Sequence, residues 1–203
     1  MAEIAHAMLR ADTRVDEESE RAHWYVLLSG LLRSPPDAAR LAAIAAVELD
    51  DSASELASAL GALAAACAST TAASVRDEFD ATFVGVGKPE VFVNASYYMT
   101  GFLHERPLAD LREELARLGI ARRPDVSDTE DHVSALCEVM AMLVAERASL
   151  DVQREFFSRF LASWIDDFAD ALERAGTTDF YKHVGRLVRA FVAIERVAFD
   201  FEQ

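Results

Sequence analysis

The chain has 203 residues, and its 35 acidic and 20 basic side chains give a net charge of −15 at pH 7. Hydrophobic residues make up 52% of the sequence, which is enough to bury a core and excludes a disordered chain. The acidic excess argues against a nucleic-acid partner and against attachment to an anionic membrane surface, because both need a basic face.

The composition favours an all-α fold. Glycine and proline are few, at 8 and 5, while alanine and leucine are abundant. At this length we expect one globular helical bundle over residues 1–203, with about eight to ten helices. Segment 1–20 is acidic and has no uninterrupted apolar stretch, so no secretory signal is expected there. No apolar window is long enough for stable membrane insertion, which predicts a cytoplasmic protein.

The first half of the chain predicts four helices. The first covers about 16–33 and ends at Pro35, because proline disfavours a helical residue before it. Two others cover about 52–69 and 72–84. The helix between Pro35 and residue 52 is expected to turn these residues inward: Leu41, Ile44 and Val47.

Segment 85–98 is the longest stretch expected to be non-helical. It contains two glycines, one proline and three aromatic residues. Loops that hold large aromatics are usually packed onto the protein and often carry function. A short helix then opens at Pro107 and is capped by Gly119. The polar link 120–128 is a candidate hinge between helical halves, so a monomer and a domain-swapped homodimer are both open.

The second half of the chain predicts amphipathic helices over about 129–147, 151–165 and 178–202. Ser127 and Glu130 have the spacing of a capping box for the first of them. The last helix is expected to bury Phe180, Val184, Leu187, Phe191 and Ile194. Cys67 and Cys137 are expected to be buried free thiols. Helical spacing favours core positions for Met140 and Met142, although flexible methionines also suit varied apolar ligands.

Motifs for metal or cofactor chemistry are weak. A helical di-iron site needs two Glu-x-x-His pairs, and the sequence has one, at Glu20 and His23. Gly85-Val86-Gly87-Lys88 departs from the phosphate-binding P-loop, and Ser96 lacks the flanking glycines of a nucleophile elbow. We therefore expect no metal, no cofactor and no catalytic residues.

The segment Asp128-Thr129-Glu130-Asp131-His132 has two interpretations. In the first, its acids cap the following helix and interact with the helix dipole. In the second, its carboxylates form a recognition site, because bidentate pairing with carboxylates selects arginine over lysine.

Several segments together resemble one known family. Segments 24–37 (Trp-Tyr-Val-Leu-Leu-Ser-Gly-Leu-Leu-Arg-Ser-Pro-Pro-Asp) and 78–88 are similar to its N-terminal helix and to the stretch before its central loop. Segment 94–98 (Asn-Ala-Ser-Tyr-Tyr) falls on its aromatic-x-Ser-x-Tyr element, and segment 128–132 on its Glu-Pro-x-Asp-His motif. This is the TorD/DmsD/NarJ family of redox-enzyme maturation proteins, and the similarity spans about residues 20–200.

The resemblance implies a TorD-like helical fold without catalysis or cofactors. It implies a cytoplasmic chaperone that binds the apo catalytic subunit of a molybdopterin oxidoreductase, or its twin-arginine signal peptide, and assists cofactor insertion before export or assembly. By position, Asp131 and His132 would be recognition residues, and Ser96 and Tyr98 would shape the adjacent loop. The sequence departs from the family at Asn94, where an aromatic is usual, and in segments 92–93 and 128–129.

Simple physical chemistry agrees with this role. A twin-arginine signal has a basic head and an apolar segment, so its receptor needs an apolar groove with an acidic rim. We expect Asp128, Glu130 and Asp131 to supply that rim, with Asn94 nearby, and the net charge of −15 to act at longer range. Two alternatives stay open: an all-helical adaptor for another basic-headed helix, and a helical enzyme that uses Asp131 and His132 as an acid–base pair.

Overall fold

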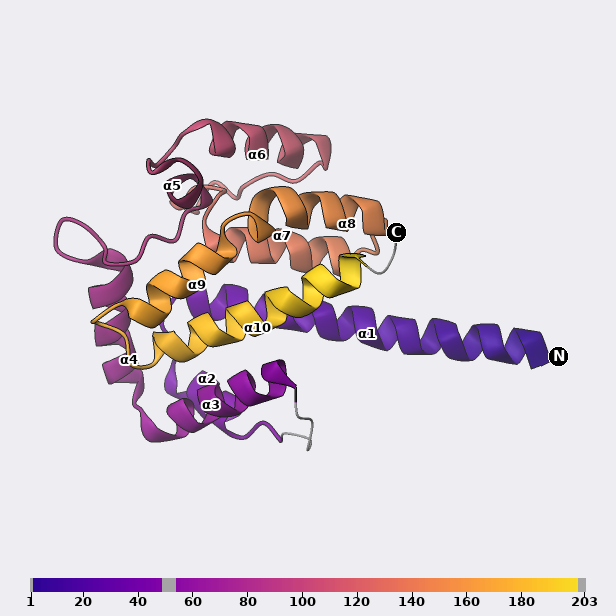
Figure 1. Cartoon of the computed structure of the whole chain (residues 1–203), viewed down its shortest axis with the longest axis horizontal. Coiled ribbons are helices and arrows are strands. Elements are labelled where there is room, and N and C mark those ends of the chain that lie inside the picture. The colour runs from indigo at the N-terminus through magenta and orange to yellow at the C-terminus, as the bar shows by residue number, and fades with distance from the viewer. Residues whose placement is uncertain (1, 49–53, 201–203) are drawn as a thin grey trace.

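The computed structural model describes residues 2–48 and 54–200, with side chains described from residue 17 onward. This part of the chain contains ten α-helices, two π-helical turns and an isolated β-bridge, which confirms the all-α fold (Figure 1). The α-helices are α1 (Ala2–Arg33), α2 (Ala38–Ala45), α3 (Glu55–Ser69), α4 (Ala72–Phe79), α5 (Ala95–Thr100), α6 (Arg106–Arg117), α7 (Val133–Ala145), α8 (Leu150–Phe157), α9 (Ile165–Arg174) and α10 (Tyr181–Asp200). The π-helical turns are η1 (Asp80–Val84) and η2 (Ser158–Ala162).

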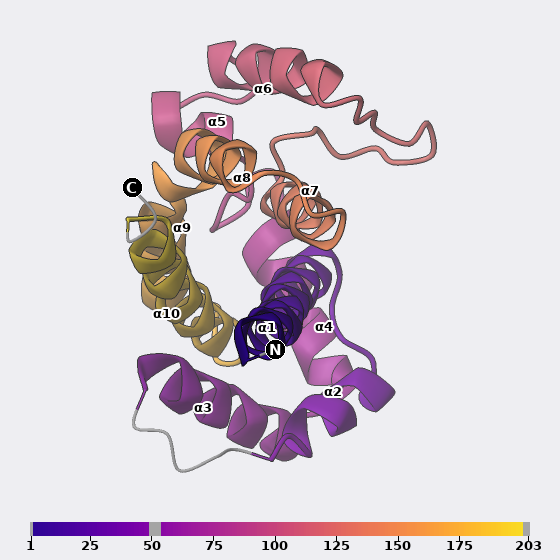
Figure 2. The same cartoon turned by 90° about the vertical axis from the view of Figure 1, so that its right-hand side faces the viewer.

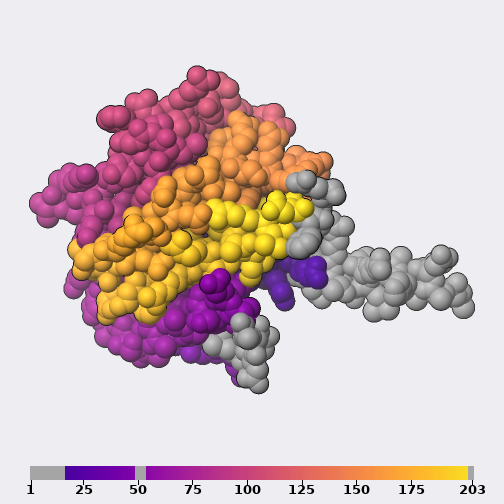
Figure 3. Space-filling view, viewed as in Figure 1, coloured from indigo at the N-terminus to yellow at the C-terminus, as the bar shows by residue number. Residues whose placement is uncertain are grey.

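A central group of helices is covered from two opposite sides (Figure 1, Figure 2). In the centre, α1 packs along α7, α9 packs along α10, and α8 contacts α7. On one side, α2 contacts α3, and α3 contacts α10. On the other side lie α5 and α6, which contact each other. The space-filling view shows α9 and α10 as a continuous surface between α3 and the α5–α6 pair (Figure 3).

The core consists largely of the faces that helical periodicity predicts. Leu28 and Leu31 of α1 are 2% and 0% exposed, and the expected core positions of α10 from Phe180 to Phe191 are all buried. The largest fully buried side chains come from α1, α8, α9, α10 and the turn before α9: Trp164, Tyr25, Tyr181, Phe156, Phe157, Phe168 and Phe191. Cys67 and Cys137 are buried free thiols as predicted, and burial raises their pKa to about 11 and about 12.

One buried ion pair was not expected from the sequence pattern. The Glu195 carboxylate on α10 is 1% exposed and accepts two hydrogen bonds of 2.8 Å from the Arg21 guanidinium on α1. The Tyr25 hydroxyl donates to the same carboxylate at 2.8 Å. Burial alone lowers the pKa of Arg21, but its hydrogen bond and charge interaction with Glu195 raise it overall. The pair therefore stays ionised and fixes α1 against α10.

Ile194 and Val47 were predicted to be buried and are not, with exposed fractions of 45% and 40%. On α10 the inward line runs through Phe191, Glu195 and Phe199, so Glu195 takes the buried position beside Ile194. Val47 lies beyond Ala45, the last residue of α2, and so no longer follows the helical face.

Several predicted element boundaries are also wrong. α1 begins at Ala2 and not near residue 16, and α5 forms inside the segment expected to be non-helical. The predicted capping box at Ser127 and Glu130 does not form, because α7 begins at Val133 and His132 is its N-cap. The link from 118 to 132 contains turns but no helix, and its role as a hinge stays a prediction (Figure 2).

Within the described residues, no single helix has the length and apolar character needed to span a membrane. One bent pair, Glu55–Ser69 with Ala72–Val84, meets those two criteria jointly across an angle of 113°.

Candidate functional site

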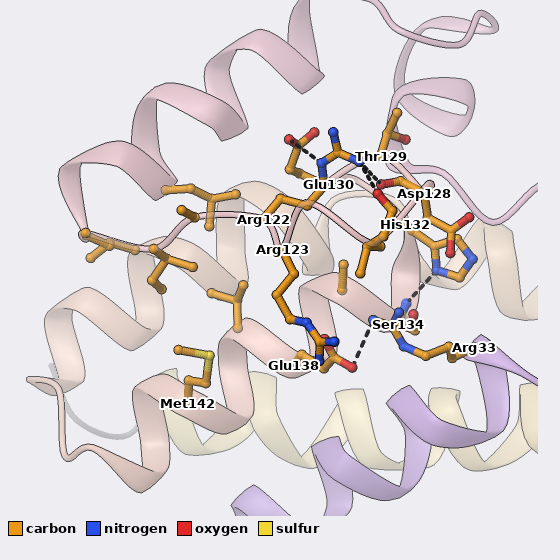
Figure 4. A pocket seen from close by; sticks show the side chains of 18 of the residues that line it. Arg33, Arg122, Arg123, Asp128, Thr129, Glu130, His132, Ser134, Glu138 and Met142 are labelled. Carbon is orange, nitrogen blue, oxygen red and sulfur yellow. Dashed lines mark hydrogen bonds and ion pairs between the residues drawn. The ribbon is translucent and has the colours of Figure 1, made fainter.

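A pocket of about 470 Å³ lies between α7, the C-terminal end of α6 and the link that joins them (Figure 4). We call it the α6–α7 pocket. It is lined by Arg33, Leu115, Leu118, Gly119, Ile120, Ala121, Arg122, Arg123, Val126, Asp128, Thr129, Glu130, His132, Ser134, Ala135, Glu138, Val139, Met142 and Glu146. On α7 these positions recur at spacings of three and four residues, so one face of the helix forms the wall.

The floor of the pocket is apolar. It combines side chains of α6, the link and α7: Leu115, Leu118, Ile120, Val126, Val139 and Met142. Met142 is 41% exposed, whereas Met140, two residues earlier, is fully buried. The predicted core position is therefore confirmed for Met140 and wrong for Met142, which instead offers a flexible apolar contact to the pocket.

The rim of the pocket carries both acidic and basic side chains. Glu138 pairs with Arg33 of α1 at 2.9 Å, and Glu130 pairs with Arg112 and Arg122 at 2.8 and 3.3 Å. The carboxylates of Asp128 and Glu146 make no ion pair within the part of the chain that the structure describes. These two acids are therefore the rim groups with negative charge left to offer a cation.

The Asp131 carboxylate is not on the rim, because its residue is only 1% exposed. It accepts hydrogen bonds from the Ser96 hydroxyl, from the Ser96 N–H at 3.1 Å, from the Thr129 hydroxyl at 2.6 Å and from the Asn94 amide at 3.1 Å. Burial by itself raises the pKa of Asp131, but the donors outweigh it and lower the pKa below its usual value.

Main-chain hydrogen bonds join the same two segments. Asn94 and His132 form the antiparallel bridge, with Ala95 N–H donating to the Asp131 carbonyl at 2.9 Å and Val133 N–H to the Val93 carbonyl at 2.8 Å. These bonds, together with the turn that the His132 N–H closes on the Thr129 carbonyl at 3.1 Å, hold residues 129–132 outside the helix, which explains why α7 starts late.

Tyr98 packs behind this junction. Its hydroxyl donates to the Phe92 carbonyl at 2.9 Å, and its ring stacks on the Trp164 ring at 5.4 Å. It thereby fixes the loop before α5 against the core.

His132 is mostly buried, at 9% exposed, and caps α7 with its ring. Its Nδ1 accepts a hydrogen bond from the Ser134 N–H at 3.1 Å, so the proton of the neutral ring belongs on Nε2. Burial, together with the nearby Arg33 charge, lowers the pKa of His132 and favours this neutral form. Within the described residues no hydrogen bond joins His132 to Asp131, so the two do not form the pair that the enzyme alternative requires.

The structure thus divides the predicted site residues into two groups. Asp128, Glu130 and His132 line the pocket. The others do not line it: Asn94, Ser96 and Asp131 hold the loop to the start of α7, and Tyr98 holds the loop against the core.

Some pocket residues were missed by sequence reasoning, notably Arg33, Ser134, Glu138 and Glu146. The sequence could have indicated Glu138, because it is the one charged residue of the apolar helix α7. No such indication existed for Arg33, because its position against α7 depends on how α1 packs. Among the described residues, no group of three or more His, Cys, Asp or Glu side chains is arranged to hold a metal ion.

Comparison with known proteins adds independent information. Residues 49–170 match the family model of the nitrate reductase delta subunit. The chaperone protein TorD of Vibrio atlanticus is 24% identical over 130 residues, which cover 58% of this chain and 60% of that protein. TorD of Vibrio cholerae serotype O1 is 24% identical over 114 residues, covering 51% and 52% of the two chains. The chain thus spans about 60% or less of the length of these curated relatives.

A solved structure shares the fold. A protein described as a redox enzyme maturation protein, from Archaeoglobus fulgidus, superposes with a TM-score of 0.58 at 20% sequence identity. The match covers 87% of this chain and 93% of the other.

Proposed function

Because the chain belongs to the nitrate reductase delta subunit family, we propose that it is a TorD-like chaperone for the maturation of a redox enzyme, with no catalytic activity of its own. Its client is a molybdopterin-containing oxidoreductase subunit, which it binds in the apo form or by the twin-arginine signal peptide. Binding keeps the client available for cofactor insertion before export or assembly. The family match at residues 49–170 includes both the Asn94–Tyr98 and the Asp128–His132 segments.

The observation that carries the proposal is the α6–α7 pocket. Its apolar floor suits an apolar segment, and the carboxylates of Asp128 and Glu146, which make no ion pair with any described residue, suit a basic head. Position 134 on α7 and position 146, the C-cap of α7, are about 18 Å apart at 1.5 Å per residue, which gives the groove room for three turns of a docked helix. Asp128, Glu130 and His132 contact the client in this proposal, whereas Asn94, Ser96, Tyr98 and Asp131 position the motif.

A calorimetric titration tests the proposal. The ligand is a synthetic peptide with two adjacent arginines followed by a leucine- and alanine-rich segment, called here the twin-arginine peptide. We expect it to bind, and Met142→Glu to weaken binding on the order of tenfold, because the new carboxylate must be desolvated under the apolar segment. Met142 is 41% exposed, so the variant should fold.

Val197→Glu is the matched control, since Val197 is an exposed apolar residue of α10, 53% exposed, that does not line the pocket. It should bind the peptide like the unmodified protein. Absence of binding by the unmodified protein, or equal losses in the two variants, would refute the proposed site.

A further inference from the structure

Two buried hydrogen-bond donors at one end of the α6–α7 pocket have no partner among the residues that the structure describes. Ser134 is 1% exposed, and its hydroxyl makes no hydrogen bond within the described residues. The Arg33 Nε–H is likewise buried without an acceptor, although the Nη2 of the same guanidinium pairs with Glu138. Both residues line the pocket, as Figure 4 shows.

The position of Ser134 explains why its hydroxyl is left over. A buried helical serine commonly donates to the carbonyl four residues before it. Ser134 is the second residue of α7, so that carbonyl belongs to Glu130 in the turn before the helix. The Ser134 N–H is already bound to the His132 ring. The start of the helix therefore leaves the buried hydroxyl without the acceptor that a mid-helix serine would have.

His132 adds a third donor at the same end of the pocket. Its Nδ1 is occupied by the Ser134 N–H, so its proton lies on Nε2. His132 lines the same pocket as Arg33 and Ser134, and the charges of Asp128, Arg33, Asp131 and Glu138 all act on its ring (Figure 4). We call Arg33, His132 and Ser134 the donor cluster.

The donor cluster calls for a neutral acceptor. The Arg33 charge is already balanced by Glu138, which also accepts a hydrogen bond from Ser29 at 3.3 Å. An additional anion would face Glu138 and Asp128, whereas an uncharged carbonyl oxygen accepts from fixed donors without that repulsion. The acceptor that every polypeptide carries is its main-chain carbonyl.

We propose that the donor cluster is a subsite for a peptide carbonyl oxygen of the docked segment, and that Ser134 determines the affinity of this contact. The inference rests on the proposed function, because the carbonyl belongs to the peptide bound in the α6–α7 pocket. A buried donor without a partner costs stability in the free protein. That cost is recovered when a ligand supplies the acceptor.

Deleting the hydroxyl separates a binding role from a structural one. Ser134→Ala should lower affinity for the twin-arginine peptide about 3- to 10-fold, the equivalent of one hydrogen bond. The thermal unfolding midpoint of the free variant should be unchanged or higher, because an unpartnered buried group is removed. If the hydroxyl instead stabilised the fold, the variant would have a lower unfolding midpoint than the unmodified protein, and that result would overturn the proposal.

Tyr181→Phe is the matched control. The Tyr181 hydroxyl is also buried and finds no partner in the described part of the chain, but Tyr181 does not line the α6–α7 pocket. This variant should gain or keep stability and bind the peptide like the unmodified protein. Equal affinities for Ser134→Ala and the unmodified protein would show that Ser134 contributes nothing to binding.

A second ligand distinguishes failure of the subsite from failure of the proposed function. N-methylacetamide is a minimal peptide group, and its titration is followed by ¹⁵N NMR of the Ser134 amide and the His132 ring. Shifts in the unmodified protein that are lost in Ser134→Ala support the subsite even if no twin-arginine peptide binds. Peptide binding without these shifts supports the function and refutes the subsite. Competition of inorganic phosphate with N-methylacetamide would also refute the subsite, because it would identify an anion site.

Discussion

Asp131 illustrates how one residue type supports two different roles. An acid before an apolar helix suggests a cap or an exposed recognition group, and the sequence offers no way to choose between them. In the structure the carboxylate accepts from four donors. Three of them come from residues far away in the sequence, Ser96 at 35 residues from Asp131 and Asn94 at 37. Because these internal donors already stabilise its negative charge, Asp131 does not attract a ligand. Its role is to hold the backbone that positions His132.

Asp131→Asn is therefore expected to destabilise the fold. The amide nitrogen replaces one of the two carboxylate oxygens, so it faces either the Ser96 donors at Oδ2 or the Asn94 and Thr129 donors at Oδ1, and the loss should be about 2–3 kcal/mol at pH 7. The folded pKa of Asp131 lies below its unfolded value, so its contribution is present above about pH 4 and is lost as the pH falls through the folded pKa. Urea unfolding of both proteins from pH 7 to pH 3 measures this difference.

Asp125→Asn is the control for that series, because Asp125 is exposed and pairs with Arg123 within the link. Its urea midpoint should follow that of the unmodified protein throughout. A difference for Asp131→Asn that grows toward acid pH would contradict the assigned role.

At the scale of elements, sequence predicts what local periodicity controls and misses what tertiary contacts control. The buried positions of α1 and α6, and those of α10 as far as Phe191, follow from spacing alone, and Gly119 ends the α6 region in the left-handed conformation, at φ 72°. The late start of α7 does not follow, because it depends on hydrogen bonds to residues 93–96. The buried Glu195 is also unpredictable, since its partner Arg21 lies 174 residues away.

α10 provides a further example, because its N-terminus is capped from another helix. The Glu78 carboxylate of α4 accepts hydrogen bonds from the Phe180 N–H at 2.9 Å and from the Tyr181 N–H at 2.7 Å. A negative group at a helix N-terminus satisfies free N–H groups and interacts favourably with the helix dipole. This contact joins α4 to α10 and fixes where the longest core helix of the second half begins.

Glu78→Ala should lower the free energy of unfolding by about 1–2 kcal/mol. Hydrogen exchange should show the loss locally, as faster exchange of the Phe180 and Tyr181 amides. Asp77→Ala, at the exposed neighbouring position, is expected to change neither quantity. Unaltered exchange at Phe180 and Tyr181 in Glu78→Ala would mean that the carboxylate does not cap α10.

For the whole molecule, the dominant property is its net charge of −15. Most of the basic side chains are used in internal ion pairs, such as Arg189 with Asp170 and Glu173. The surplus acids therefore give a negative field that extends beyond the pocket. Such a field steers a basic ligand toward the protein but contributes little once the ligand is bound, because close contacts then dominate.

This division predicts how peptide binding depends on salt. Raising ionic strength from about 0.05 to 0.5 M shortens the screening length, so the association rate of the twin-arginine peptide should fall by about tenfold or more. Its dissociation rate should change much less, because the apolar floor around Met142 is not screened. Stopped-flow fluorescence with a labelled peptide measures both rates, and a peptide with its arginines replaced by glutamine should associate at a nearly salt-independent rate. If salt acted mainly on dissociation, the binding energy would reside in the ion pairs of Asp128 and Glu146, and the apolar floor would be secondary.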